Sequence, residues 1–182
     1  MTEGLALLQA ATPELHGEIT ELLSEMLFAQ ASAGATMEFD GASHYQFWGL
    51  LLLNPSHHHT PLAIAEVLAQ EAGHSLLFGL TIDEPLVHND DNELFVSPLR
   101  PDPRPMDGIH HATFVSARMT WAMEALADRV LLTPAEQRHA RGEAAKDREN
   151  FRRAGRRSCS MAACQRLARK FTENAHRWVH AG

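Results

Sequence analysis

Two groups of polar side chains in the middle third of the chain have the composition of a metal site. Gln70-Glu71-Ala72-Gly73-His74 lies within an otherwise apolar stretch, and His110-His111 lies at the start of a later one. On an α-helix, residues four apart share a face and residues three apart are neighbours. Gln70 and His74 should therefore lie together with Glu71 beside them, and we expect the two groups to form one site.

The first group has the spacing of an H-E-x-x-H metal motif, with glutamine in place of the first histidine. A carboxamide is a poor ligand for a divalent transition metal and cannot be deprotonated to become a better one. Gln70 is therefore expected to line the site without binding the metal. Taken alone, Glu71 and His74 would also fit a buried structural pair. Two buried helices that both present histidines, however, are the usual frame of a metal site in a helical bundle.

The elements that must position these residues can be predicted from helix start signals. Thr is a good N-cap, and a proline in the first turn loses no hydrogen bond, so each Thr-Pro pair indicates a helix start. Such pairs occur at Thr12-Pro13, Thr60-Pro61 and Thr133-Pro134. Apolar periodicity then predicts helices over about 13–30, 61–80, 108–127, 134–153 and 160–180. The segment from Tyr45 to Leu53 fits either a buried helix or a strand.

The predicted fold is all-α or nearly all-α, with the helices over 61–80 and 108–127 buried at the centre. Between them, residues 81–107 contain five prolines from Pro85 to Pro105, which exclude a helix and favour an extended loop along the site. Asp107 is expected to be the N-cap of the helix after this loop. We expect a single domain over residues 1–182, with the motif region at 60–127.

Overall composition excludes several classes of function. A net charge of −7 argues against nucleic-acid binding, which favours a basic surface. No apolar run is long enough for a membrane span or a signal peptide, and two cysteines without paired spacing fit a reducing compartment. These features predict a cytoplasmic protein with no membrane or nucleic-acid partner. The run His57-His58-His59, in a loop just before Pro61, is expected to bind metal adventitiously.

Two runs of residues carry a resemblance to a known family. They are Glu-Val-Leu-x-Gln-Glu-Ala-Gly-His-x-Leu-Leu from Glu66 to Leu77, and Ser-Pro-Leu-Arg-Pro-Asp-Pro-Arg-Pro-Met-Asp-Gly from Ser97 to Gly108, followed by His111. With these runs, the stretch from Thr60 to about Ala127 resembles the H-E-x-x-H domain family of 2-oxoglutarate-type peptide β-hydroxylases from natural-product gene clusters. Gln70 departs from the family pattern at the position of its first ligand.

The resemblance implies a metal-dependent oxygenase or hydroxylase that tailors an amino acid or peptide. It implies His74 and His111 as metal ligands and Glu71 as third ligand or base, so that Glu71 and Gln70 are the predicted catalytic residues. Two histidines and one carboxylate with open positions suit non-haem Fe(II), with 2-oxoglutarate as a possible cosubstrate. Arg100 and Arg104 would bind a carboxylate of cosubstrate or substrate, since a guanidinium pairs with it bidentately.

Other interpretations remain open. A haem oxygenase or peroxidase would use His74 or His111 as an axial ligand. A degenerate member of the family would bind a peptide or partner in the old pocket, and Gln70 favours this class. A di-iron site built from the pairs Glu71/His74, Glu136/His139 and Glu173/His176, and a zinc protease, are weaker fits. The sequence does not decide whether the chain forms a homodimer.

Overall fold

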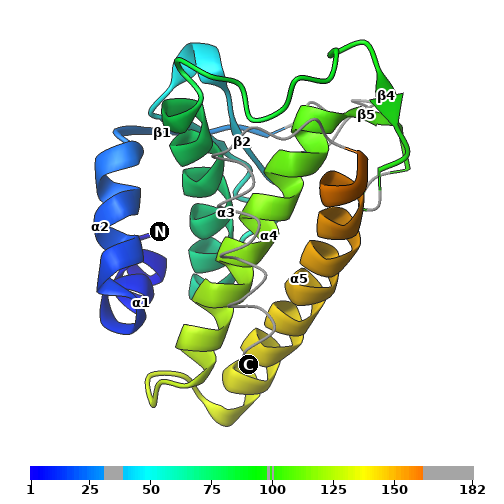
Figure 1. The fold of residues 1–182 in the computed structure, drawn as a ribbon. Helices are drawn as coiled ribbons and strands as arrows, with labels where there is room; N and C mark the ends of the chain where they lie inside the picture. The colour runs from blue at the N-terminus through cyan, green and yellow to red at the C-terminus, as the bar shows by residue number, and fades with distance from the viewer. Residues whose placement is uncertain (31–38, 98, 100, 162–182) are drawn as a thin grey trace.

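The computed structural model describes residues 1–30, 39–97, 99 and 101–161, the last six of these without their side chains. Its helices are α1 (Thr2–Ala11), α2 (Pro13–Leu22), α3 (Pro61–Leu80), α4 (Met106–Ala127) and α5 (Pro134–Met161). In Figure 1, α4 lies between α3 and α5, while α1 and α2 cover the other side of α3. The prediction of a mainly helical chain is confirmed.

Two small sheets accompany the helices. β1 (Glu25–Phe28), β3 (Leu50–Leu53) and β2 (Gly41–Ser43) form one sheet in that order, with β1 parallel and β2 antiparallel to β3. A short 3-10 helix, η1 (Tyr45–Phe47), precedes β3. β4 (Leu94–Phe95) and β5 (Arg104–Pro105) form an antiparallel pair. The fold is therefore predominantly helical with short strands.

The helix predicted over residues 13–30 is wrong beyond Leu22. The chain turns at Leu23, and β1 begins two residues later. Its backbone pairs with β3, and the N–H groups of Ser24 and Glu25 donate to the carbonyl of Gly49, the residue before β3, at 2.9 and 3.1 Å. Pairing with a strand distant in sequence has thus overridden the local helical pattern, as tertiary context often does.

The central helix α3 has the predicted bounds. The Thr60 side chain accepts a hydrogen bond from the N–H of Ala63 at 3.1 Å, and Pro61 occupies the first turn. The helix packs against α1, α2, α4 and β2, so most of its surface is covered. Many of its apolar residues are buried, and Leu68 and Leu77 are fully so. α3 is therefore a rigid support for the polar residues it carries.

Helix α4 begins earlier than predicted, at Met106. Its N-cap is Pro105, so the prediction of Asp107 as N-cap is wrong. The proline has a φ of −54°, which already suits the turn into the helix. Asp107 lies instead in the first turn, where a carboxylate interacts favourably with the helix dipole.

Helix α5 continues through Gly155 to Met161, where two helices were predicted. The second of these, over residues 160–180, lies almost wholly outside the described residues. So do Cys164, Glu173 and His176, and the side chain of Cys159. α5 packs along α4 and buries Phe151 against Ala117.

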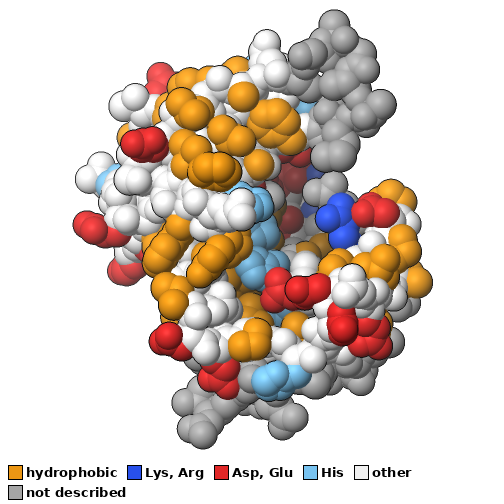
Figure 2. Space-filling model, turned by 90° about the horizontal axis from the view of Figure 1, so that it is seen from above, with side chains coloured by type: hydrophobic (Ala, Val, Ile, Leu, Met, Phe, Trp, Pro, Cys, Tyr) orange, Lys and Arg blue, Asp and Glu red, His pale blue; other side chains and the backbone are white. Residues whose placement is uncertain are grey.

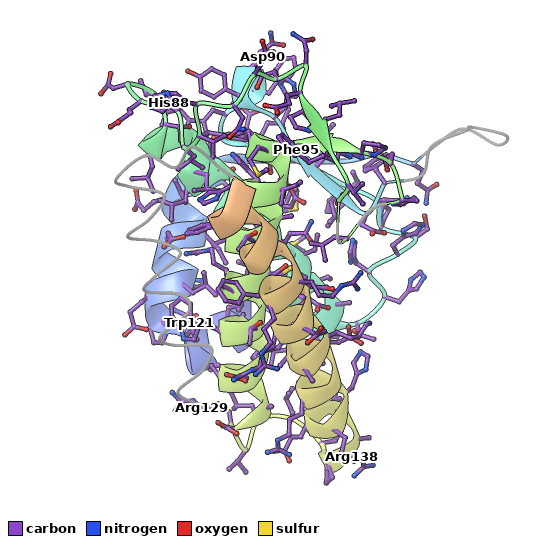
Figure 3. The ribbon with its side chains drawn as sticks, turned by 45° about the vertical axis from the view of Figure 1, so that its right-hand side comes forward. His88, Asp90, Phe95, Trp121, Arg129 and Arg138 are labelled. Carbon is purple, nitrogen blue, oxygen red and sulfur yellow. The ribbon has the colours of Figure 1, made fainter. Side chains whose placement is uncertain are left out.

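The described residues between α3 and α4 form no helix, as the prolines of this segment predict. The segment closes one end of the helices, where Figure 3 places Asp90 and Phe95, whereas Arg129 and Arg138 lie at the opposite end. None of the helices in the described ranges is both long and apolar enough to cross a membrane. The start of α4, which carries His111, is thus at the end that this loop covers.

Candidate metal-binding site

The structure brings His74 of α3 and His111 of α4 into direct contact. Their Nδ1 atoms are 3.1 Å apart, and the two ring planes are inclined by 15° with centroids separated by 5.4 Å, so the rings meet edge to edge. The ring of Phe78, one turn after His74, lies 5.7 Å from that of His111. The predicted meeting of the two histidines is therefore present in the fold.

Close packing of α3 on α4 at Gly73 allows this contact. A Cβ atom on Gly73 would lie 3.0 Å from Cδ of Arg118 and 3.1 Å from Cγ1 of Val115. Val115 is one turn after His111, so a larger residue at position 73 would push α4 away beside the histidine pair. The glycine therefore allows the close packing of the two helices.

Both imidazoles are held in the neutral form. Burial lowers the pKa of His74 to about 4, and the proximity of His111 adds to the effect. Burial also lowers the pKa of His111 to about 4, with His110 as the second cause. Neutral imidazole is the form that binds a metal ion. At neutral pH both rings are therefore uncharged. Neither ring has to lose a proton before the pair can bind a metal ion.

The separation of the two nitrogens alone matches that of adjacent ligands of one metal ion, but the ring centroids lie as far apart as this separation allows, so the two Nδ1 atoms face each other and the rings must turn to converge on a metal. Metal–nitrogen bonds of about 2.0–2.1 Å place two ligand nitrogens about 3.0 Å apart at a right angle and about 3.4 Å apart at a tetrahedral angle. The observed 3.1 Å lies between these values. In the absence of metal, the same distance suits an N–H of one ring donated to the other.

The histidine pair forms part of the wall of a pocket of about 510 Å³. Viewed from the loop-covered end, the surface is hollowed, with histidine side chains on one wall and charged side chains near its mouth (Figure 2). Its apolar lining comprises Phe78, Leu99, Ala112, Val115 and Met119. Its polar lining comprises Gln70, His74, Ser97, Arg104, Asp107, His111, Ser116, Asp147 and Asn150.

Glu71 is not brought together with the histidines. Its side chain is 2% exposed, does not line the pocket and faces β2, where a Cβ on Gly41 would lie 3.1 Å from its Oε1 atom. Oε1 accepts a hydrogen bond from Nε2 of Gln70 at 3.2 Å, while Oε2 has no partner among the described residues. Burial raises the pKa of the Glu71 carboxyl above its usual range. Gln70 thus lines the pocket and links it to a buried acid.

Asp107 is a carboxylate beside His111. Its Oδ2 atom lies 3.7 Å from Nε2 of His111, one turn along α4. A carboxylate on the outer nitrogen of a ligand histidine orients the ring and favours a proton on that nitrogen, which leaves Nδ1 free to bind. His110 is 3% exposed and does not line the pocket, so the two adjacent histidines have different surroundings.

The predicted carboxylate-binding arginines are only partly accounted for. Arg104 lines the pocket, with its Nε atom 2.7 Å from Oδ2 of Asp102 and about half of its side chain exposed. Arg100 lies outside the described residues. Arg104 is therefore the described arginine at the pocket wall, where an anionic group would have to displace Asp102 from it.

The third ligand predicted for the metal has no counterpart in the described ranges. There, no three side chains of histidine, cysteine, aspartate or glutamate are grouped so that they could hold one metal ion. His74 and His111 fit a metal as a pair, and the other coordination positions would be taken by water or by the substrate.

Sequence reasoning missed Asp147 and Asn150, which α5 contributes to the pocket. The segment from 134 to 153 reads as a polar, solvated helix because its charges are so many. Within it, however, the buried positions follow a spacing of four and three residues: Ala140, Ala144, Asp147, Phe151 and Ala154. An aspartate in an otherwise apolar stripe was the signal that could have found it.

No family model matches the chain, and no curated protein matches it significantly.

Proposed function

We propose that this protein is a metal-dependent oxygenase whose iron ion is held by His74 and His111, and that it oxidises an amino acid or peptide in the pocket beside them. The observation that carries the proposal is the pair of neutral imidazoles with Nδ1 atoms 3.1 Å apart in the wall of a 510 Å³ pocket. Iron with positions open to other ligands supplies the oxygen chemistry. The class of substrate is taken from the resemblance.

The remaining residues of the pocket bind and orient. Asp107 orients His111 through its Nε2 atom. Phe78, Val115 and Met119 exclude water from the space beside the histidines, which strengthens polar interactions there. Arg104 binds an anionic group of the substrate or of 2-oxoglutarate. Glu71 faces β2, and we give it no part in metal binding.

A second candidate is a metal-free pocket that binds a peptide or partner. The lack of a three-ligand group in the described part of the chain favours it. Haem remains a candidate with one histidine as axial ligand. Two nitrogens 3.1 Å apart cannot occupy opposite faces of one iron, because two bonds of about 2.0–2.1 Å would separate them by about 4 Å.

Oxygen uptake after anaerobic reconstitution with Fe(II) tests the proposal. We expect iron-dependent uptake that is lost in His111→Ala and kept in His139→Ala, an exposed histidine on α5 that does not line the pocket. Stimulation by 2-oxoglutarate that disappears in Arg104→Ala would identify the cosubstrate. Uptake that is independent of iron, or unchanged in His111→Ala, contradicts the proposal. A Soret band in the purified protein would favour haem.

A further inference from the structure

Asp147 is a charged residue type at a core position of α5. Its neighbours in the buried stripe of the helix, Ala144 and Phe151, are apolar, and Asp147 itself is 5% exposed. Burial of an aspartate costs free energy unless it is paired, so the position calls for a function. The side chain borders the pocket, and Asn150 borders it one turn later.

One oxygen of Asp147 lacks a hydrogen-bond partner. Its Oδ2 atom is buried and, among the described residues, nothing donates to it. The carboxyl shares a hydrogen bond with Glu66 of α3, and burial, Glu66 and Glu143 together raise the pKa of Asp147 to about 8. Burial likewise raises the pKa of Glu66. The two carboxyls thus hold a proton between them when the pocket is empty of cations.

The basic groups nearby are engaged elsewhere. Nζ of Lys146 lies 2.7 Å from Oε2 of Glu143, and Nδ1 of His139 lies 4.0 Å from the other oxygen of Glu143. In the pocket wall, Arg104 pairs with Asp102. No ion pair to Asp147 is formed within the described residues. Its unpartnered oxygen is therefore available to a cation that enters the pocket.

We propose that Asp147 binds the protonated amino group of a ligand in this pocket. That this ligand is the substrate rests on the proposed function. The binding of the amino group itself requires no metal. An ammonium group donates hydrogen bonds, which the unpartnered acceptor lacks, and a charged donor makes the stronger kind of bond. A metal ion is a poorer fit, because no three-ligand group occurs in the described residues.

Binding is coupled to loss of a proton. In the empty pocket the Asp147 carboxyl is neutral at pH 7. When the ammonium group binds, the carboxyl releases its proton to solvent and the resulting carboxylate accepts a hydrogen bond from nitrogen. No other bond forms or breaks. Uptake of the amine should therefore release up to one proton per ligand near neutral pH, which a merely apolar pocket would not do.

Calorimetry with benzylamine and its neutral counterpart, benzyl alcohol, tests this inference. The ring suits the apolar lining formed by Phe78, Val115 and Met119. We expect the amine to bind at least about tenfold more tightly than the alcohol. Titrations in two buffers of different ionisation enthalpy should show proton release. In Asp147→Asn both the preference and the proton release should disappear, whereas Glu149→Gln, which changes an exposed acid of the same helix, should keep both.

Equal affinity for amine and alcohol overturns the inference, as does undiminished amine binding by Asp147→Asn or no binding of benzylamine at all. Circular dichroism of the variant shows that it is folded. The same titrations on His111→Ala separate the two proposals. If His111→Ala binds no metal but still binds benzylamine, the ammonium site is supported even though the metal site is lost.

Discussion

Replacement of Asp147 by asparagine should stabilise the protein at neutral pH. In the folded protein, burial first and Glu66 second raise the pKa of this carboxyl from 3.8 to about 8. The unfolded chain therefore loses the proton near pH 4, while the folded chain keeps it to about pH 8. Folding takes up a proton throughout this window, so the contribution of Asp147 to stability falls as pH rises. Asparagine has no such dependence and can still donate a hydrogen bond to Glu66.

The size of the effect follows from the shift. Each pKa unit corresponds to about 1.4 kcal/mol, so a shift of about four units sets a ceiling of about 5 kcal/mol near pH 7.5. The proton is shared with Glu66, which lowers the part that the variant recovers. We expect Asp147→Asn to raise the free energy of unfolding by about 2–3 kcal/mol near pH 7.5 and by close to zero near pH 4.

Urea unfolding of the wild type and the variant at a series of pH values measures this difference. Other groups contribute to each curve separately: the lowered pKa values of His74 and His111 reduce stability as pH falls below about 6.5. Because these contributions are the same in the wild type and in Asp147→Asn, they cancel in the difference between the two curves. Glu149→Gln, at an exposed position of the same helix, should follow the wild type. A variant that is no more stable than wild type at pH 7.5, or equally stabilised at every pH, refutes the reasoning.

Two further substitutions, with Gly142→Ala as a control, test the frame of the site. Thr60→Ala removes the side chain that caps α3 through the N–H of Ala63, and should lower the free energy of unfolding by about 1 kcal/mol in urea titrations. Gly79→Ala places a Cβ 2.8 Å from Cζ2 of Trp48 and should destabilise by about 1–3 kcal/mol, with a change in tryptophan fluorescence. Gly142→Ala, where the added Cβ meets nothing, should instead stabilise by about 0.5–1 kcal/mol. Equal changes in the free energy of unfolding in Gly79→Ala and Gly142→Ala would contradict this account.

Local signals predicted α3 well because its bounds depend on nearby residues. Thr60 and Pro61 start the helix wherever the rest of the chain lies, and an apolar surface ensures its burial. β1 could not be predicted in the same way. Its four residues are helical in local pattern and become a strand only through pairing with Leu50–Leu53, which the local sequence does not encode.

The candidate site shows the same division. Spacing along α3 and α4 predicted that His74 and His111 would meet, and they lie 3.1 Å apart. Spacing also put Glu71 beside His74, but a helix turns by about 100° per residue, and this rotation carries Glu71 toward β2. Asp147 was missed because its burial depends on the packing of α5 against α4. The many charged residues of α5 hide the narrow row of buried positions in which Asp147 lies.

Metal binding by purified variants tests the central claim most directly. The background protein is the triple variant His57→Ala, His58→Ala and His59→Ala, which removes the loop histidines outside the pocket. Titrated with Fe(II) without oxygen, it should bind the metal stoichiometrically, and adding His74→Ala or His111→Ala should abolish binding, while adding His139→Ala should not. Equal metal binding by all four proteins, or none by any of them, would contradict a centre built on His74 and His111.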